Sequence, residues 1–147
     1  MKKRISLLLS VLTFPILVFS QLQGQERIDS LESIIENMPD SAHKIESLEE
    51  LFYETIYSTP SQGLQYAQKG LHLSRKIENW DGVGIAYYHI GVYHKLIFEP
   101  DSARYYYDKS MAVWQEHPNE QFKAITLGSI AALEYEKGNF DEAIAIQ

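Results

Sequence analysis

The stretch EYEKGNFDEAIAIQ (residues 134–147) contains the local signals that decide the fold. Gly138 is suited to end a helix, and Asn139 or Asp141 is suited to start the next one. Acidic residues follow at the start of that second helix, where the helix dipole favours negative charge. The stretch therefore predicts a tight turn between two antiparallel helices, the second of which runs for about two turns before the sequence ends.

The same signals recur upstream with a period of 40 residues. Three stretches align, TPSQGLQYAQKGLHL (59–73), EPDSARYYYDKSMAV (99–113) and NFDEAIAIQ (139–147). The small residues Gly63, Ala103 and Ala143 recur 40 residues apart. Three positions earlier Pro60 and Pro100 also recur, and Phe140 occupies that position in the third stretch. Further small residues recur at Gly70 and Ser110, and at Gly91 and Ala131, where the first unit has Leu51. Small residues at such spacings favour close packing of two helices, so each unit is interpreted as a helical hairpin.

The start of each helix is indicated by capping residues. Asp81 is a candidate cap for a helix through GVGIAYYHIGVYHKLI (82–97), and Pro100 fits the first turn of its partner helix. Upstream, one helical face is formed by the apolar residues Ile28, Leu31, Ile34 and Ile35. Pro39 then ends this helix. Residues 21–43 are therefore predicted to form a leading helix and linker that covers the first hairpin.

The first 20 residues have the layout of a secretory signal peptide. Lys2, Lys3 and Arg4 precede an apolar run that ends at Phe19 and Ser20. The run is short for a membrane span, so export to the periplasm or cell envelope is predicted, with a retained anchor as the alternative. Removing this segment leaves ten basic against 20 acidic residues, a net charge of −10, which argues against nucleic acid and anionic membranes as partners. The sequence has no cysteine, which excludes disulfides and a lipid-modified cysteine.

Taken together, the segments IAALEYEKGNFDEAI (130–144) and YYHIGVYHKLIFEPDSARYYYDKSMAV (87–113) resemble the tetratricopeptide repeat (TPR) family. The resemblance implies an all-α fold, a right-handed superhelical stack of antiparallel helix pairs that is incomplete at the C-terminus. It implies repeats at 44–83, 84–123 and, truncated, 124–147. The 40-residue period is longer than the standard unit of about 34 residues and is similar to a longer variant found in bacterial signalling proteins. Leu51, His94 and Glu134 depart from the family's usual residues.

In this family the first helix of each pair lines the inner surface. The resemblance therefore implies a partner-binding groove that includes Ile85, Tyr88, Val92 and Lys95. An apolar, aromatic strip of this kind suits an extended or helical segment of a partner protein. The strip lacks the lysine and asparagine pattern with which some relatives hold a terminal carboxylate. The other tyrosines are interpreted mainly as packing between helices.

No residue pattern indicates catalysis, a metal or a cofactor. His89 and His94 lie on different helical faces, and the carboxylates Glu46, Glu49, Glu50 and Glu54 are typical of a solvated helix surface. The sequence has neither a glycine-rich phosphate loop nor a nucleophile elbow. We therefore expect no enzymatic activity within these residues.

The final helix carries Ile144 and Ile146 without a polar capping helix. Repeat arrays need such a cap, so we expect the sequence to be part of a longer protein, with fraying of the last helix as the alternative. Similarity to exported repeat regions then implies the N-terminal sensory part of a signalling protein, such as a histidine kinase or helix-turn-helix regulator. Such a sensor is expected to respond to its partner by a change in superhelix shape. A stand-alone envelope adaptor is the alternative, and part of an enzyme with a downstream catalytic domain is a more distant one.

Overall fold

The computed structural model describes residues 24–146, which fall into two compact units divided between Asn37 and Met38. The described residues form helices and no strand, which confirms the all-α prediction. In the first unit, residues 24–37 are helical, in agreement with the apolar spacing of that segment. The predicted signal peptide, residues 1–20, lies outside the described residues.

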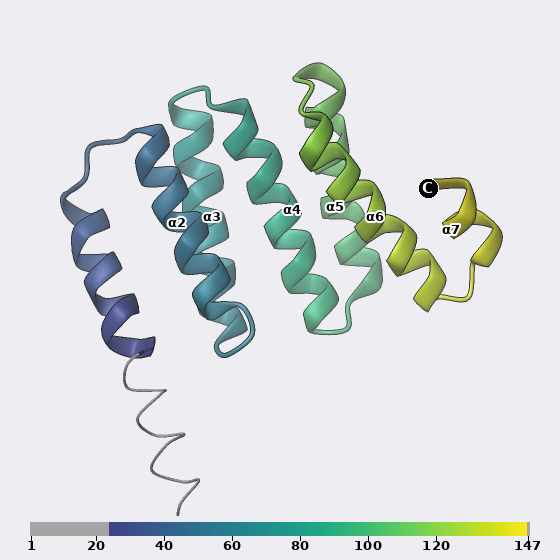
Figure 1. The fold of residues 1–147 in the computed structure, drawn as a ribbon, viewed down its shortest axis with the longest axis horizontal. Helices are drawn as coiled ribbons and strands as arrows, with labels where there is room; N and C mark the ends of the chain where they lie inside the picture. The colour runs from purple at the N-terminus through teal and green to yellow at the C-terminus, as the bar shows by residue number, and fades with distance from the viewer. Residues whose placement is uncertain (1–23, 147) are drawn as a thin grey trace, which may run out of the picture. The chain divides into compact units, whose positions relative to one another are not determined.

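The second unit is a succession of helices that repeats with the period of the sequence (Figure 1). The helices are α2 (Ala42–Thr55), α3 (Pro60–Lys76), α4 (Trp80–Leu96), α5 (Pro100–Glu116), α6 (Glu120–Glu136) and α7 (Phe140–Ile146). Each of α3, α4, α5 and α6 has 17 residues. The first residues of α3, α5 and α7 are Pro60, Pro100 and Phe140, the three positions aligned by the repeat. Helices α4 and α6 begin a few residues before the predicted repeat boundaries at 84 and 124.

Polar side chains start the first helix of each pair. Ser41, Asn79 and Asn119 accept hydrogen bonds from backbone N–H groups three residues later, at 3.2, 2.9 and 3.2 Å. Asn79 therefore caps α4 in place of Asp81, which lies in the first turn of that helix. An acidic residue there still interacts favourably with the helix dipole.

Short turns with one left-handed residue connect α3 to α4, α4 to α5, and α6 to α7. Glu78, Phe98 and Gly138 have φ values of 56°, 60° and 86°. In each turn the N–H of the next residue donates to a carbonyl five residues earlier, at distances of 2.8 to 2.9 Å. This arrangement satisfies carbonyl groups that the helix end leaves free. Only Gly138 adopts the conformation without a side-chain penalty, because glycine has no Cβ atom.

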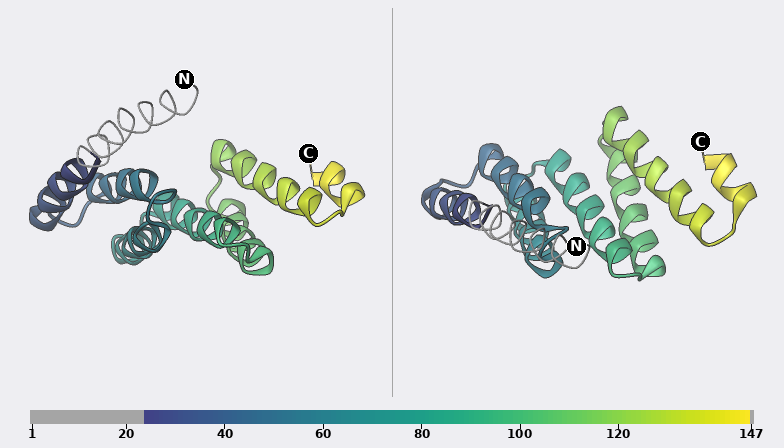
Figure 2. Two further views of the ribbon diagram at one scale, coloured as in Figure 1. Left: turned by 90° about the horizontal axis from the view of Figure 1, so that it is seen from below. Right: turned by 60° about the horizontal axis from the view of Figure 1, so that its bottom comes forward.

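Each helix of the second unit packs against the next one in the chain, and Figure 2 shows the same succession in two further views. Helix α4 also contacts both α2 and α6, whereas α3 makes no contact with α5 among the described helices. The first helices of the pairs thus touch one another directly, and the second helices do not. We call the surface formed by α2, α4 and α6 the first-helix face.

Small residues allow several of these close contacts. The seven predicted packing residues are all buried, namely Gly63, Gly70, Gly91, Ala103, Ser110, Ala131 and Ala143. A Cβ atom at Gly91 would lie 2.5 Å from the ring of buried Tyr107, so a side chain there has no room. Gly84, which the repeat alignment did not single out, is closer still, since its Cβ would lie 2.2 Å from the ring of Trp114. Gly70 differs, because no atom lies within 4 Å of the corresponding point.

Candidate functional site

The four predicted groove residues lie along α4 in different surroundings. Ile85 is only 7% exposed, so it belongs to the core more than to the surface. Tyr88 and Val92 are partly buried and pack against a core cluster from α5 and α6, made of Ala103, Tyr107, Ile130 and Leu133. Lys95 is partly buried and forms an ion pair with Glu136 of α6, with 3.0 Å between Nζ and Oε1.

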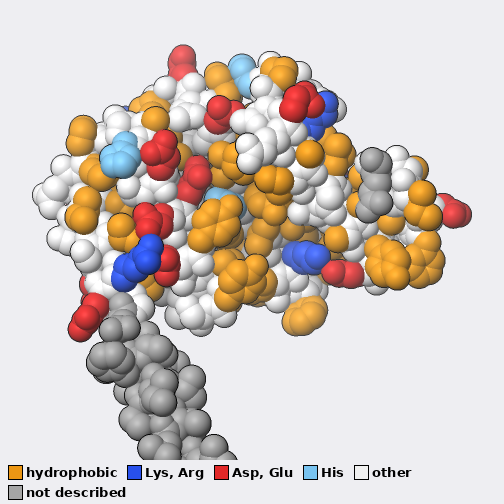
Figure 3. Space-filling model, in the orientation of Figure 1, with side chains coloured by type: hydrophobic (Ala, Val, Ile, Leu, Met, Phe, Trp, Pro, Cys, Tyr) orange, Lys and Arg blue, Asp and Glu red, His pale blue; other side chains and the backbone are white. Residues whose placement is uncertain are grey.

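Four tyrosines from successive elements meet on or beneath the first-helix face, and we call them the tyrosine cluster. Tyr53 of α2 and Tyr57 in the following turn are 56% and 77% exposed. The ring of Tyr88 lies 5.7 Å from that of buried Tyr107, and its hydroxyl accepts a 3.4 Å hydrogen bond from Ser129 of α6. Figure 3 shows hydrophobic side chains gathered where α2 and α4 lie next to each other. The cluster extends the predicted strip from one helix to several.

The tyrosines are close enough to affect one another's ionisation. Burial raises the pKa of Tyr53, and nearby Tyr88, Glu49 and Tyr57 raise it further. Burial also raises the pKa of Tyr107, with Tyr88 and Glu136 adding to the effect. Tyr53 and Tyr107 therefore keep their hydroxyl hydrogens near neutral pH and combine a polar, uncharged hydroxyl group with an apolar ring.

His89 holds Tyr53 in place from α4. Its ring stacks on Phe52 with 4.0 Å between centroids, and its Nε2 lies 3.0 Å from the Tyr53 hydroxyl oxygen. Burial lowers the pKa of His89 to about 3, so the ring is neutral at physiological pH. A neutral imidazole can accept the hydroxyl hydrogen of Tyr53, which fixes the position of an otherwise exposed ring. His89 is therefore a packing histidine. The other histidine of this helix, His94, stacks on Tyr106 at 5.1 Å and contacts Glu99 at 2.8 Å.

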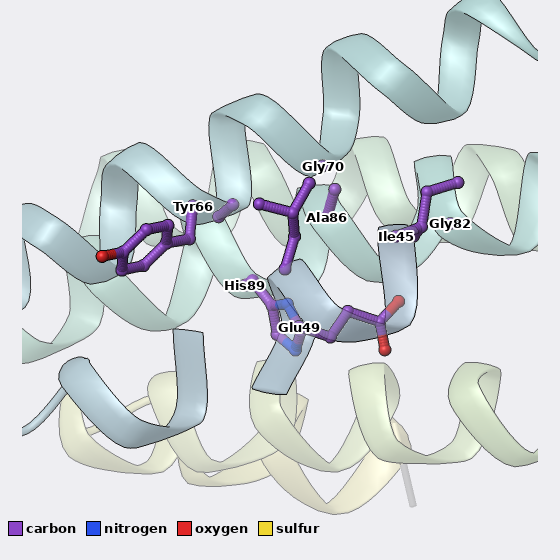
Figure 4. A pocket seen from close by; sticks show the side chains of 9 residues that line it. Ile45, Glu49, Tyr66, Gly70, Gly82, Ala86 and His89 are labelled. Carbon is purple, nitrogen blue, oxygen red and sulfur yellow. The ribbon is translucent and has the colours of Figure 1, made fainter. Parts of the chain in front are cut away.

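A cavity of about 10 Å³ lies among α2, α3 and α4, and Glu49 and His89 line it together with Gly70 (Figure 4). This volume is close to the minimum for one water molecule. Glu49 is partly buried, and burial raises its pKa to about 7, with repulsion from Glu46 and Asp81 adding to the effect. The solvated-surface interpretation of Glu49 is therefore wrong, because its carboxyl group lies against the α2–α4 contact.

Glu134, one of the departures from the family pattern, is a buried carboxylate at the end of α6. It accepts hydrogen bonds from Asn139 at 2.6 Å and from Arg104 of α5 at 2.9 Å. These donors lower the pKa of Glu134, the bond from Asn139 contributing most. The network fixes the turn into α7 and is structural in character.

Metal sites and membrane spans were also sought within the described part of the chain. Among residues 24–146, acidic and histidine side chains do not gather in groups of three or more suited to a metal ion. Over the same residues, none of the helices combines the length and apolar character needed to cross a membrane. No protein-family model matches the chain, and no curated protein matches it in sequence.

Sequence reasoning placed Tyr88, Val92 and Lys95 near one another and missed the contribution of α2. Tyr53 and His89 are 36 residues apart, and only the packing of α2 on α4 joins them. A sequence signal was nevertheless present, because Glu49, Tyr53 and Tyr57 are spaced by four and therefore share one helical face. The candidate site is thus the first-helix face around the tyrosine cluster.

Proposed function

We propose that this chain is a protein-binding repeat module of the TPR type, and that the first-helix face is its binding surface. The observation that carries this proposal is the tyrosine cluster, in which Tyr53 and Tyr57 remain exposed although neighbouring residues hold Tyr53 in place. Exposed aromatic residues on a rigid support are the usual anchors of protein interfaces, because they bury large area at little entropic cost.

Two further features support a superhelical TPR-type arrangement. Helices α3 and α5, like α4 and α6, begin 40 residues apart and have 17 residues each, as in a stack of equivalent units. The first helices contact one another while α3 and α5 do not, which favours a stack that curves towards the first helices. In such a stack the first-helix face is concave, and a concave face suits an extended or helical segment of a partner.

The cellular setting of the module follows from the family resemblance and is proposed with it. We propose that the module is exported and belongs to the sensory part of a signalling protein, with a stand-alone envelope adaptor as the alternative. Fusion of residues 1–30 to a reporter enzyme that folds only outside the cytoplasm tests the export step. We expect an active reporter, and an inactive one would contradict export.

The binding function is tested by selecting peptides from a displayed library of random 12-residue sequences on the full chain. We expect selected peptides to bind about tenfold or more weakly to Tyr53→Ala and to the double variant Tyr88→Ala, Val92→Ala. Tyr105→Ala is the matched control, because Tyr105 is an equally exposed tyrosine of α5 outside the first-helix face.

Circular dichroism must show that the variants remain folded. Tyr53→Ala is the more decisive variant, since Tyr88 and Val92 also pack against the core and their loss lowers stability. Peptides that bind all variants equally, or a library that yields no peptide, would refute this assignment of the binding surface.

A further inference from the structure

The carboxylate of Glu49 has no cationic partner in the described part of the chain. Glu49 forms neither a hydrogen bond nor an ion pair with a described residue, although it is partly buried. Its charged neighbours, Glu46 and Asp81, are acidic, and the neighbouring His89 is neutral. A partly buried carboxylate in acidic surroundings is unfavourable when ionised, and a cation beside it would remove that penalty.

The lysine side chains of α2 and α4 already form ion pairs with other residues. Lys44 of α2 is ion-paired with Asp40 at 3.6 Å, and Lys95 of α4 is ion-paired with Glu136 at 3.0 Å. The first-helix face around Glu49 is therefore negatively charged and complementary to a basic group from outside.

Aromatic rings from α2, the turn after it and α4 lie near this carboxylate. Tyr53 follows Glu49 by one helical turn and interacts with it electrostatically. Tyr57 lies in the turn just after α2, and both Tyr57 and Tyr88 of α4 lie close enough to affect the ionisation of Tyr53. The faces of tyrosine rings attract cations, so these rings and the carboxylate favour the same kind of ligand.

We propose that the first-helix face binds a segment of a partner protein through an arginine side chain, whose guanidinium group pairs with Glu49 and stacks on Tyr53. This proposal rests on the proposed function, since it names the chemistry of the partner segment. Arginine fits better than lysine, because its planar guanidinium both pairs with a carboxylate through two hydrogen bonds and stacks on an aromatic ring. A bound metal ion fits less well, because the acidic and histidine side chains of residues 24–146 do not gather in groups of three or more suited to such an ion.

The ionisation of Glu49 predicts how the binding of an arginine side chain depends on pH. The groups that face it are Glu46 from α2, Asp81 and His89 from α4, and Tyr66 from α3 across the cavity. His89, with its pKa lowered to about 3, does not titrate near neutral pH, whereas the pKa of Glu49 is raised to about 7. An arginine side chain favours the ionised form of Glu49, so its binding should tighten as the pH rises from about 6 to 8.

The test compares two small probes, N-acetyl-arginine amide and N-acetyl-citrulline amide, which share shape and differ in charge. Each is titrated into the full chain with labelled tyrosine rings, and binding is followed by NMR at pH 8. We expect the arginine probe to shift the signals of Tyr53 and to bind about tenfold more tightly than the citrulline probe. In Glu49→Gln that preference and its pH dependence should disappear. Glu116→Gln is the control, because Glu116 is an exposed acid of α5 and the charge change is identical.

The outcomes separate this proposal from the proposed function. Equal binding of both probes, or an arginine preference that survives Glu49→Gln, would overturn the arginine proposal. If library peptides still lose affinity for Tyr53→Ala in that case, the binding surface stands and only the arginine chemistry fails. If no library peptide is selected but the arginine preference depends on Glu49, the proposed function fails and the cation site stands.

Discussion

Alanine substitutions at Gly70 and Gly84 should change stability in opposite directions, although the chemical change is the same. Both glycines are buried in the middle part of the chain, Gly70 in α3 and Gly84 in α4. A Cβ at Gly70 meets no atom within 4 Å, because this residue lines the small cavity between α2, α3 and α4. A Cβ at Gly84 would lie 2.2, 2.4 and 2.7 Å from three ring carbons of Trp114, which is 1% exposed.

The magnitudes follow from these distances. Alanine is favoured over glycine in a helix interior by about 1 kcal/mol, and this gain applies at both positions. At Gly70 nothing opposes it, so Gly70→Ala should stabilise the chain by about 1 kcal/mol. At Gly84 the normal separation of carbon atoms, about 3.5 to 4 Å, can be restored only by moving a fully buried ring. Such overpacking costs up to about 3 kcal/mol, so Gly84→Ala should destabilise by about 2 kcal/mol net.

Urea unfolding of the full chain, followed by helical circular dichroism, measures both changes. We expect the urea midpoints of the two variants to lie on opposite sides of the wild-type midpoint. The unfolding free energies of the two variants should differ by about 3 kcal/mol. An unchanged slope of free energy against urea would show that the comparison is between equivalent transitions. If Gly84→Ala is as stable as Gly70→Ala, the close contact between α4 and Trp114 described above is wrong.

Two carboxylates should have opposite effects on the dependence of stability on pH. The pKa of Glu134 is lowered by its hydrogen bonds, so its contribution is present above the unfolded-state value of 4.5 and lost as the pH falls below it. Glu134→Ala should therefore destabilise the chain by about 2 kcal/mol at pH 7, because Asn139 and Arg104 lose a charged acceptor, and Glu134→Gln should reduce the loss of stability in acid. The pKa of Glu49 is raised to about 7 from 4.5, so ionisation costs stability as the pH rises through that interval. Glu49→Gln should raise the melting temperature at pH 8 and leave it nearly unchanged at pH 4, and an equal effect at both values would contradict the burial of this carboxyl group.

The helices and their turns could be predicted because their signals are local. Proline fits the first turn of a helix, and Pro60 and Pro100 occupy that position in α3 and α5. Gly138 adopts the left-handed conformation expected of a residue that ends a helix. The cap of α4 was assigned to Asp81 because aspartate and asparagine are both good caps. The choice of Asn79 follows from the left-handed residue Glu78, which ends the turn two residues earlier than the sequence pattern indicates.

The candidate site was harder to predict because it depends on contacts between helices. The sequence identified the strip on α4, but Ile85 lies in the core, and the exposed members of the tyrosine cluster come from α2 and the turn after it. The packing of His89 on Phe52 brings those tyrosines next to α4, and neither residue is marked by the repeat alignment. The raised pKa of Glu49 also depends on its burial against α4, which places Asp81 and His89 beside it. Its spacing from Glu46, Glu50 and Glu54 on one helix contains no such information.

The position of Tyr88 connects the proposed binding surface with the packing of the helix pairs. Tyr53 and Tyr57 are exposed, so a partner can cover them with little effect on the core. Tyr88 instead contacts Tyr107 of α5 and Ser129 of α6, while Tyr107 is fully buried and touches the backbone position of Gly91. A partner that displaces Tyr88 must therefore alter the contact between two successive helix pairs, since a close-packed core transmits such a shift. A partner that contacts only Tyr53 and Tyr57 need not do so. NMR of the chain with labelled tyrosine rings can distinguish the two cases. If peptide binding makes the signals of both Tyr88 and Tyr107 exchange between two states, the arrangement of the repeats changes, as the proposed sensory role requires.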